Sequence, residues 1–372
     1  MSTEVIGEGT YGCVTKPSIK CRDKSIAYDN KVSKIMVKED ALKEYADMVE
    51  LSKNKNINEY IIPQPELCKP MIDDSFHDTL KKCENEEFPV TKDEDFLLLV
   101  MEDGGVSLRT LTEKIIYTMT EHDVHVFLTK VHHLMTGLLY FNKKGIVHHD
   151  VAARNVVYNL KNGKIRFIDF GLLQNSRVMM DECRKSINKN AKFWSNFPPE
   201  NGYANYTKFQ NVGLEMDYDL FLERLVYTFD WYSLGYTMQS VLKELYKTSK
   251  ISDTVFQEIY QYFRTLGEEH IQKRDYNIDV MARSYKTLLL KHHIWTEQHP
   301  NPSLKSIQLQ NRFKNVKSFF PESSLHVATA LSIKQSKCKK GFYRNGKTKR
   351  CVIRRCRKNY KRNKLTRRCV PK

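Results

Sequence analysis

One segment constrains the fold more than any other, residues 148–171, with the sequence HHDVAARNVVYNLKNGKIRFIDFG. It contains two short runs rich in β-branched and aromatic residues, VVYNL and KIRFIDF, which are joined by a KNG turn. This pattern predicts a β-hairpin. Because a hairpin returns the chain to its starting point, the polar residues on either side of it are expected to meet at one site.

The polar residues around this hairpin suit the chemistry of phosphate transfer. Asp150 lies on the predicted loop before the first strand, Asn155 begins that strand, and Asp169 follows the second strand. A loop aspartate can accept the proton of an incoming hydroxyl, and amide and carboxylate oxygens are the ligands that Mg²⁺ prefers. A single aspartate in such a place is most often a cap or turn residue. The joint spacing of all three argues against that explanation here.

A glycine pattern near the N-terminus indicates a phosphate-binding loop. Between two predicted strands in residues 1–14, the sequence GEGTYGCV contains the pattern G-x-G-x-x-G-x-V. Glycines allow backbone N–H groups to approach phosphate oxygens without a Cβ in the way. Dinucleotide-binding folds share this spacing, but a helix follows their glycines, whereas a strand follows here. The pattern alone leaves a structural turn as an equal alternative. The residues predicted to bind nucleotide are Gly7, Glu8, Gly9, Gly12 and Val14.

Lys34 lies in the predicted strand KVSKIMV. A strand lysine can hold the α- and β-phosphates of a nucleotide when a carboxylate orients it, although a solvated lysine is the commoner case without such context. The helix predicted next offers Glu44 and Glu50 as partners. An apolar side chain should face the core four residues beyond the pairing glutamate, and that residue is Met48 for Glu44 but an asparagine for Glu50. We therefore expect Glu44 to be the partner.

The order of predicted elements indicates an α+β fold, with a β-rich part followed by a mainly helical one. The N-terminal part is expected to contain strands at 1–14, 31–37 and 96–101, a helix at 40–53 and a loop insertion at 63–95. The helix is expected to bury the stripe Leu42, Tyr45, Ala46 and Val49. After Gly104 and Gly105, helices are expected to about residue 300, apart from the strands around 156–168. Residues 296–337 suggest a linker with some helix.

These motifs together resemble the eukaryotic-type protein kinase family over roughly residues 1–300. GEGTYGCV resembles its glycine-rich loop, VSKI its strand-three lysine motif, HHDVAARN its catalytic loop and DFG its magnesium motif. PPE (198–200) lies where the family has A-P-E. FDWYSLG (229–235) resembles the helix whose aspartate, here Asp230, would hold the catalytic-loop backbone from beneath. Six motifs in this order and spacing are highly specific.

The resemblance implies a bilobal kinase domain at 1–300, with an N-lobe at 1–103 and a C-lobe at 104–300. A linker (301–337) and a tail (338–372) would follow. The implied activity is transfer of the γ-phosphate of ATP to a protein hydroxyl, with Mg²⁺, or Mn²⁺ as the alternative, held by the asparagine and aspartate named above.

The resemblance also implies an adenine site in the segment LLLVMEDGG. Met101 would occupy the gatekeeper position, and Glu102 and Gly104 would offer backbone groups to adenine. Val14 and Val32 would cover the ring from the N-lobe.

The catalytic loop departs from the family at two positions. His149 replaces an arginine that normally binds a phosphate on the activation loop, so activity is expected not to require phosphorylation between Leu172 and Phe197. We expect His149 to be a neutral loop residue, the alternative being a protonated anion ligand that makes regulation pH-sensitive. Ala152 replaces a lysine that is usual in serine/threonine kinases. The form V-A-A-R-N is instead like that of tyrosine kinases, with Arg154 as the cation near the γ-phosphate.

Other features favour serine or threonine as the acceptor. The glycine-loop pair Thr10-Tyr11 and the segment WSNFPPE resemble serine/threonine kinases of large cytoplasmic DNA viruses, which would place the protein in the host cytoplasm or the virion. The alternatives are a dual-specificity or tyrosine kinase, a pseudokinase scaffold and a small-molecule phosphotransferase. PPE and the DWYSLG helix argue against the last of these, because they typify a platform for protein substrates.

The positive charge of the chain is concentrated at its C-terminus. The net charge is +17, but residues 338–372 contain sixteen Lys or Arg and no acidic residue, which leaves about +1 for the rest. The sequences CKKGFYRNGKTKRCV (338–352) and CRKNYKRNKLTRRCV (356–370) form two copies of a repeat with a period of 18 residues. The spacing C-x12-C differs from that of zinc knuckles, so zinc binding is the lesser alternative. Each pair could instead close a hairpin, with a disulfide in a virion or another oxidising setting.

The tail is predicted to bind nucleic acid. Its charges would neutralise phosphates, and Phe342, Tyr343 and Tyr360 could stack on bases. An acidic protein or an anionic membrane surface would attract the same charges, and a solubilising or targeting tail is the plainer alternative.

The rest of the sequence is typical of a cytosolic globular protein. Its hydrophobic content of 41% allows a sizeable core. No apolar run is long enough for a membrane helix, and the N-terminal residues lack the pattern of a secretory signal. We therefore expect reduced thiols. The cysteines without a pairing pattern, at positions 13, 21, 68, 83 and 183, are predicted to be free.

Overall fold

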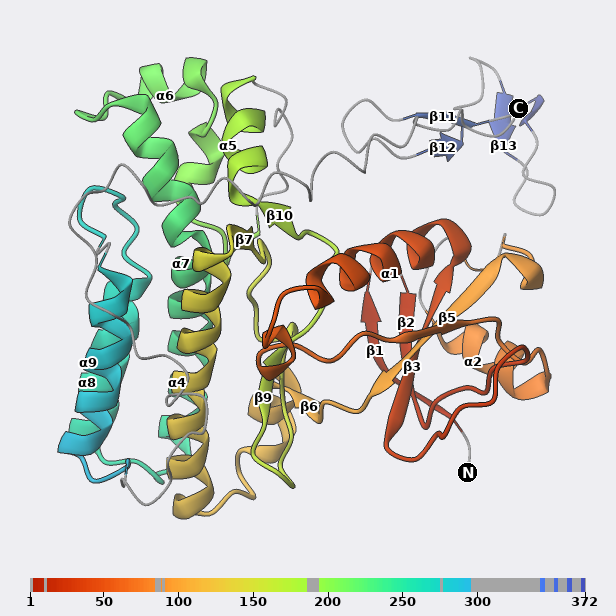
Figure 1. Cartoon of the computed structure of the whole chain (residues 1–372), viewed down its shortest axis with the longest axis horizontal. Helices are drawn as coiled ribbons and strands as arrows, with labels where there is room; N and C mark the ends of the chain where they lie inside the picture. The colour runs from red at the N-terminus through yellow and green to blue at the C-terminus, as the bar shows by residue number, and fades with distance from the viewer. Residues whose placement is uncertain are drawn as a thin grey trace.

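The computed structural model describes residues 3–9, 12–83, 88, 91–185, 194–274 and 277–295, and the strand backbones 342–344, 351–353, 360–362 and 369–371. It has a β-rich N-lobe beside a larger helical C-lobe (Figure 1). The N-lobe sheet has the order β1-β2-β3-β5-β4, with every neighbouring pair antiparallel. Its strands are β1 (Glu4–Gly9), β2 (Gly12–Lys16), β3 (Lys31–Val37), β4 (Glu66–Cys68) and β5 (Phe96–Glu102).

Helices cover both faces of this sheet. Successive residues of a strand point to opposite faces, so Lys34 and Met36 share one face while Ile35 faces the other way. Met36 packs with helix α1 (Lys38–Ser52), and Ile35 packs in the cluster that contains residues of helix α2 (Asp74–Lys82). The sheet therefore has an α1 face and an α2 face.

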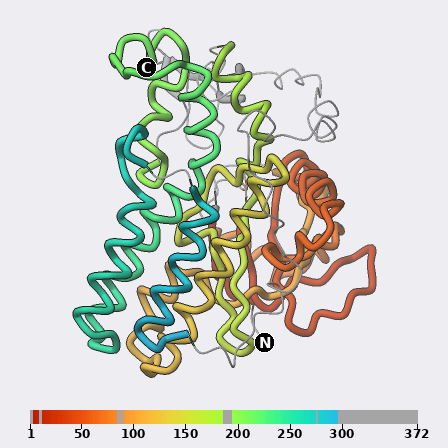
Figure 2. Tube along the Cα trace, turned by 60° about the vertical axis from the view of Figure 1, so that its left-hand side comes forward, coloured from red at the N-terminus to blue at the C-terminus, as the bar shows by residue number. Residues whose placement is uncertain are grey.

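The C-lobe is built from long helices that run side by side: α4 (Glu121–Lys143), α7 (Tyr218–Lys247), α8 (Asp253–Leu266) and α9 (Ile278–Lys291). Figure 2 shows these helices next to one another, with the N-lobe to one side. Thr120 and Asp123 form a capping box that fixes the start of α4. Helix α7 is apolar on most of its circumference and is buried, as expected for a central helix.

Short elements of the C-lobe carry the predicted site. The hairpin of β8 (Val156–Tyr158) and β9 (Ile165–Phe167) is present, and β6 (Val106–Ser107) extends it to three strands. Strand β7 (Ile146–Val147) pairs with β10 (Gln174–Asn175). The remaining elements are η1 (Ile57–Glu59), η3 (Asp93–Asp95), α3 (Leu108–Thr110), the π-helical turn η4 (Leu111–Ile115), α5 (Ser176–Arg184), η5 (Pro199–Tyr203) and α6 (Tyr206–Val212).

Two expectations about the N-lobe were wrong. The stripe that α1 buries is Ala41, Met48 and Leu51, whereas Leu42 is 45% exposed. Ala41, a small residue, packs against the sheet with Met36 and Leu99. A pattern that looks for large apolar side chains does not detect such a position. The insertion 63–95 is also more than a loop, since it supplies β4 and α2.

The expectation of five free thiols was wrong for four of them. Cys13 is bonded to Cys83, and Cys21 to Cys68. All four are buried in the cluster on the α2 face of the sheet. Separations of 70 and 47 residues carry no pairing signal in the sequence, and the fold alone brings these cysteines together. Cys183 is a buried thiol in the C-lobe.

Each copy of the tail repeat contains a pair of antiparallel strands. Strand β11 (Phe342–Arg344) pairs with β12 (Cys351–Ile353), and β13 (Tyr360–Arg362) pairs with β14 (Cys369–Pro371). The register is the same in both copies, because an arginine lies opposite the second cysteine of each. The predicted linker 301–337 lies outside the described residues.

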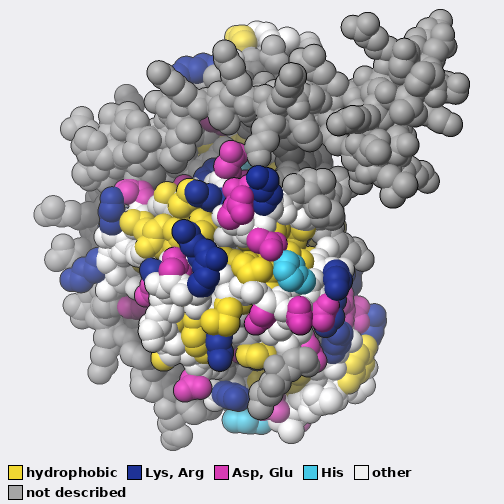
Figure 3. Space-filling view, turned by 90° about the vertical axis from the view of Figure 1, so that its right-hand side faces the viewer, with side chains coloured by type: hydrophobic (Ala, Val, Ile, Leu, Met, Phe, Trp, Pro, Cys, Tyr) yellow, Lys and Arg dark blue, Asp and Glu magenta, His cyan; other side chains and the backbone are white. Residues whose placement is uncertain are grey.

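The body of the protein carries mixed charge. In Figure 3, acidic and basic side chains alternate with hydrophobic ones over the described part of this face. This agrees with the near-neutral sum for residues 1–337. Among the described helices, none combines the length and apolar character needed to cross a membrane.

Reduction is predicted to destabilise the N-lobe. The two disulfides join cysteines that are 70 and 47 residues apart. A disulfide that closes a long loop typically stabilises a fold by about 2–4 kcal/mol. Urea unfolding with and without a phosphine reductant, followed by fluorescence, should show a lower midpoint for the reduced wild type. The Cys21→Ala/Cys68→Ala double variant should lose less on reduction than the wild type. Equal midpoints for oxidised and reduced wild type would exclude a stabilising role for both bonds.

Candidate active site

The catalytic loop is held by one buried carboxylate. Asp230, on α7, accepts hydrogen bonds from the backbone N–H groups of His148 (2.7 Å) and His149 (2.9 Å). His149 has φ of 66°, and Asp169 has φ of 62°. Non-glycine residues keep this left-handed conformation only where the surroundings fix it, and for His149 the bond to Asp230 does so.

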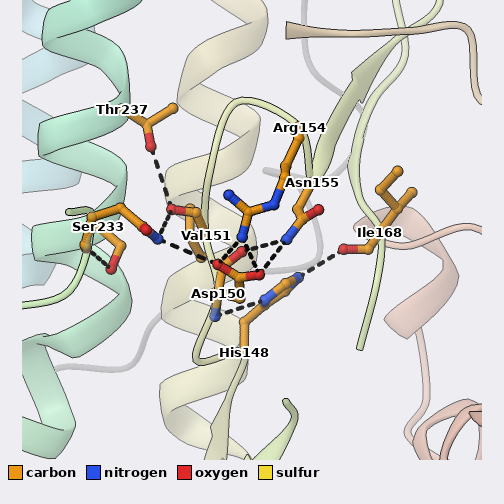
Figure 4. Close-up of polar contacts among 9 residues, drawn as sticks. His148, Asp150, Val151, Arg154, Asn155, Ile168, Ser233 and Thr237 are labelled. Atoms are coloured by element: carbon orange, nitrogen blue, oxygen red, sulfur yellow. Dashed lines mark hydrogen bonds and ion pairs between the residues drawn. The ribbon is translucent and has the colours of Figure 1, made fainter. Parts of the chain in front are cut away.

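The carboxylate of Asp150 lies at the centre of a group of donors (Figure 4). The Nη2 atom of Arg154 lies 2.8 Å from Oδ1 and 2.6 Å from Oδ2. The Nδ2 atom of Asn155 donates to Oδ2 (2.8 Å) and to the backbone oxygen of the same aspartate (2.9 Å). Asp150 is therefore oriented by neighbours on its own loop.

The hairpin brings Asn155 and Asp169 to the same site. Strands β8 and β9 pair directly, and Ile168 N–H, just before Asp169, donates to the backbone oxygen of Asn155 (2.9 Å). Because the side-chain nitrogen of Asn155 is used by Asp150, its side-chain oxygen is left as the outward atom, as Figure 4 shows. An amide oxygen and the exposed carboxylate of Asp169 form a donor set that suits Mg²⁺ or Mn²⁺.

Lys34 and Glu44 form an ion pair in the N-lobe. The Nζ atom of Lys34 lies 2.6 Å and 2.8 Å from the two carboxylate oxygens of Glu44. Burial favours the neutral amine, but the negative charges of Glu44 and Asp169 outweigh it, so the pKa of Lys34 is raised. Lys34 is therefore positively charged, and its charge interacts with Glu44 in the N-lobe and with Asp169 in the C-lobe.

The α1 face of the sheet gathers the residues expected to contact nucleotide. Val14 lies opposite Lys34 in the β2–β3 pair, and Val32 lies opposite Met101 in the β3–β5 pair. Gly7 and Gly9 lie on β1, across from Val14 and Gly12. A Cβ on Gly12 would lie 2.3 Å from the backbone oxygen of Ile35, so only glycine fits there.

The hinge between the lobes offers one backbone donor. Asp103 N–H donates to Asn30 O, and Gly105 N–H donates to the Asp103 side chain, both at 2.9 Å. Among the described residues, nothing accepts from the intervening Gly104 N–H. A Cβ on Gly104 would lie 2.7 Å from Val157, which explains the glycine at this position.

His149 occupies an apolar pocket. Its ring stacks on Phe197, with centroids 5.1 Å apart, and lies 4.5 Å from the ring of Phe229. Burial lowers the pKa of His149 from 6.5 to about 4, although the charge of Asp150 acts in the opposite direction. The residue is therefore neutral near pH 7, which disfavours the alternative that it binds an anion.

Three polar contacts of the site region were not foreseen from the sequence. Arg274 forms a buried ion pair with Glu200 of PPE, at 2.9 Å, and Arg166 pairs with Glu102 of the hinge at 3.2 Å. Asn196 donates a hydrogen bond into the catalytic loop. Arg274 alone lies outside the segments that the sequence singled out; the other residues lie in PPE, LLLVMEDGG, KIRFIDF and WSNFPPE. The contacts themselves carry no local signal, because the partners are distant in the chain.

The buried histidine should give the protein an acid-sensitive stability. The unfolded chain takes up a proton on His149 near pH 6.5, whereas the folded chain does so only near pH 4. The unfolded state binds more protons between these values, so the free energy of unfolding should fall as the pH drops through this window, by an amount on the order of 3 kcal/mol. Denaturant unfolding at several pH values measures it.

The matched variant is His149→Asn, because asparagine tolerates the left-handed backbone and does not titrate in this range. In this variant the free energy of unfolding should depend less steeply on pH between 6.5 and 4. Part of the dependence should remain, because His132 is also buried with a pKa of about 4. An unchanged slope would show that His149 is already protonated, or exposed, in the native state.

One family model matches this chain. The model described as "Protein kinase domain" aligns with residues 1–188, which is half of the chain. The matched range contains the glycine loop, Lys34, the catalytic loop and the DFG motif, whose geometry is described above. PPE (198–200) and helix α7 (Tyr218–Lys247) lie beyond the end of this range. The chain belongs to the protein kinase family.

Proposed function

We propose that the protein is an active kinase that transfers the γ-phosphate of ATP to a protein hydroxyl. The observation that carries this proposal is the coexistence of two arrangements, the Lys34–Glu44 ion pair and the oriented carboxylate of Asp150. A scaffold that merely binds nucleotide has no need of a base fixed in this way. The family match supports kinase chemistry in general.

The proposed mechanism assigns one task to each group. The glycine loop and Lys34 hold the phosphates of ATP, with Glu44 fixing the lysine ammonium. The Gly104 N–H and the neighbouring hinge backbone hold adenine, between the side chains of Val14, Val32 and Met101. Asn155 and Asp169 would hold the divalent cation, which would neutralise charge on the phosphates.

Asp150 then acts as the general base. Its carboxylate accepts the proton of the substrate hydroxyl while the hydroxyl oxygen attacks the γ-phosphorus. The bond to the bridging oxygen breaks, and ADP leaves. Arg154, which contacts Asp150 at 2.6 Å, supplies a positive charge near the transferred group.

We infer that the acceptor is serine or threonine. The support is the sequence of the glycine loop and of the WSNFPPE segment, which resemble serine/threonine kinases of large cytoplasmic DNA viruses. The tyrosine-kinase form of the catalytic loop, with Ala152 and Arg154, favours tyrosine or dual specificity and is the alternative. The substrate class is therefore an outcome to be measured.

Protein purified from bacteria and treated with phosphatase should transfer ³²P from [γ-³²P]ATP to a generic protein substrate. Phosphatase treatment should not abolish this activity, because neutral His149 has no charge to offer a phosphate on the activation loop. Asp150→Asn removes the base and should lower the rate by about 10²- to 10⁴-fold. Phosphoamino-acid analysis should find phosphoserine or phosphothreonine.

Asp169→Asn is the second variant, because it removes a metal ligand and leaves the base in place. It should be inactive while its fold, measured by circular dichroism, is unchanged. Nucleotide binding without any turnover by the wild type would instead identify a pseudokinase. Transfer to small-molecule acceptors alone would identify a small-molecule phosphotransferase.

We propose separately that the tail, residues 338–372, binds nucleic acid. The support is its sixteen positive charges without an acidic residue, carried on two hairpins of identical register. The near-neutral body offers no comparable charge. Neutralising phosphates releases counterions, so such binding weakens steeply with salt.

Full-length protein should be retained on RNA or single-stranded DNA at low salt and released at high salt, and a variant that ends at residue 337 should not be retained. Both proteins should have the same kinase activity on a generic substrate. Equal retention of the two proteins would contradict the proposal, and salt-dependent binding only to anionic vesicles would assign the tail to membranes.

A further inference from the structure

The last residues of the activation segment touch the catalytic loop directly. The guanidinium carbon of Arg154 lies 5.5 Å from the ring centroid of Trp194. Phe197 stacks on His149, with an angle of 23° between the rings. Trp194 and Phe197 thus contact Arg154 and His149, which lie on either side of Asp150 in the sequence. The end of the activation segment is therefore packed against the catalytic loop both before and after the proposed base.

Asn196 lies between these two contacts and reaches the base itself. It is only 5% exposed. Its Nδ2 atom donates to the backbone oxygen of Val151 (3.1 Å) and to Oδ1 of Asp150 (3.4 Å). Its backbone oxygen accepts from the hydroxyl of Ser233, on α7, at 2.7 Å. Thr237, one turn further along α7, also donates to Val151 O (3.3 Å). The backbone of Asn196 is thus held by helix α7, and its side-chain amide donates to the catalytic loop.

We propose that Asn196 is a positioning residue, which couples the placement of the activation segment to the orientation of the Asp150 carboxylate. This inference rests on the proposed kinase function, in which Asp150 is the base. Because the side-chain amide of Asn196 is uncharged, this coupling does not require phosphorylation of the activation segment.

The geometry explains why this amide matters. The terminal torsion of an aspartate is broad, so its carboxylate rotates easily unless both oxygens are held. Asn155 donates to Oδ2, and Asn196 donates to Oδ1. Arg154 contacts both oxygens, but its side chain is 43% exposed and lies against the Trp194 ring. The two buried amides therefore each hold one oxygen of the carboxylate.

The coupling also accounts for the buried, neutral His149. In the family an arginine at this position normally binds a phosphate on the activation loop, and the segment is ordered through that contact. Here Phe197 fills the space beside the histidine, and Asn196, its neighbour in sequence, makes the polar contact. Order in the activation segment is thus transmitted to the base through packing and one amide.

The test uses two substitutions in the full-length protein. Asn196→Ala removes the donor and should lower kcat by about 10- to 100-fold, since small misplacements of a catalytic group cost this much. The KM for ATP should change less than about twofold, because the nucleotide contacts lie elsewhere. Asn196→Asp replaces the donor by a carboxylate next to Asp150. Because aspartate keeps the size of asparagine but lacks its N–H donor, this variant should lose at least as much kcat as Asn196→Ala.

Asn201→Ala is the matched control. Asn201 lies five residues after Asn196, in η5, and is also 5% exposed; its side chain has no hydrogen-bond partner among the described residues. This variant should keep wild-type kcat, which shows that loss of a buried asparagine is not enough. Thermal unfolding of each variant reports whether the fold survives.

The outcomes separate the two proposals. An inert wild type would overturn the kinase function and this inference together. An active wild type with an equally active Asn196→Ala variant, or an Asn196→Asp variant that keeps wild-type kcat, would overturn the role of Asn196 alone. Equal losses of kcat in Asn196→Ala and Asn201→Ala would show that the effect is structural.

Discussion

The hydrogen bonds that Asp230 accepts from His148 and His149 are the contact on which the site depends. The carboxylate is buried, and burial raises its pKa above the ordinary value although the two N–H donors act in the opposite direction. Without it, two backbone N–H groups would be buried without partners, each at a cost of about 1–3 kcal/mol. It also holds the left-handed conformation of His149, which directs the next residue, Asp150, toward its donors.

The same helix fixes the rest of the loop. Asp230, Ser233 and Thr237 follow one another at spacings of three and four residues, so they lie along one face of α7. They contact the start of the catalytic loop, the activation segment at Asn196 and the loop backbone at Val151, respectively. A single rigid element therefore sets the distances between segments that are far apart in sequence. This explains why α7 is so thoroughly buried.

The parts of the site that could be predicted from the sequence are those whose geometry is local. Asp150, Asn155 and Asp169 lie on either side of one hairpin, so spacing alone implies that they meet. The Lys34–Glu44 pair required only that an apolar residue, Met48, face the core on the same helix. In contrast, Asn196, the Arg274–Glu200 pair and the two disulfides join residues that only the tertiary fold brings together. The exposed Leu42 shows a different limit, since a helix can present a small residue to a close neighbour.

The two faces of the N-lobe sheet have opposite requirements, and the alternation of side chains along a strand lets one sheet meet both. Cys13 and Val14 are neighbours on β2, yet Cys13 joins the closed α2 face through its bond to Cys83, while Val14 lies on the α1 face opposite Lys34. Disulfides and aromatic packing secure β4 and α2 to the closed face. On the other side the proposed nucleotide site needs glycines where backbone N–H groups would approach phosphates, and at Gly12 the strands come too close for any side chain. A loop that covers phosphates needs both a well-packed sheet face behind it, here the α2 face, and glycines in its strands.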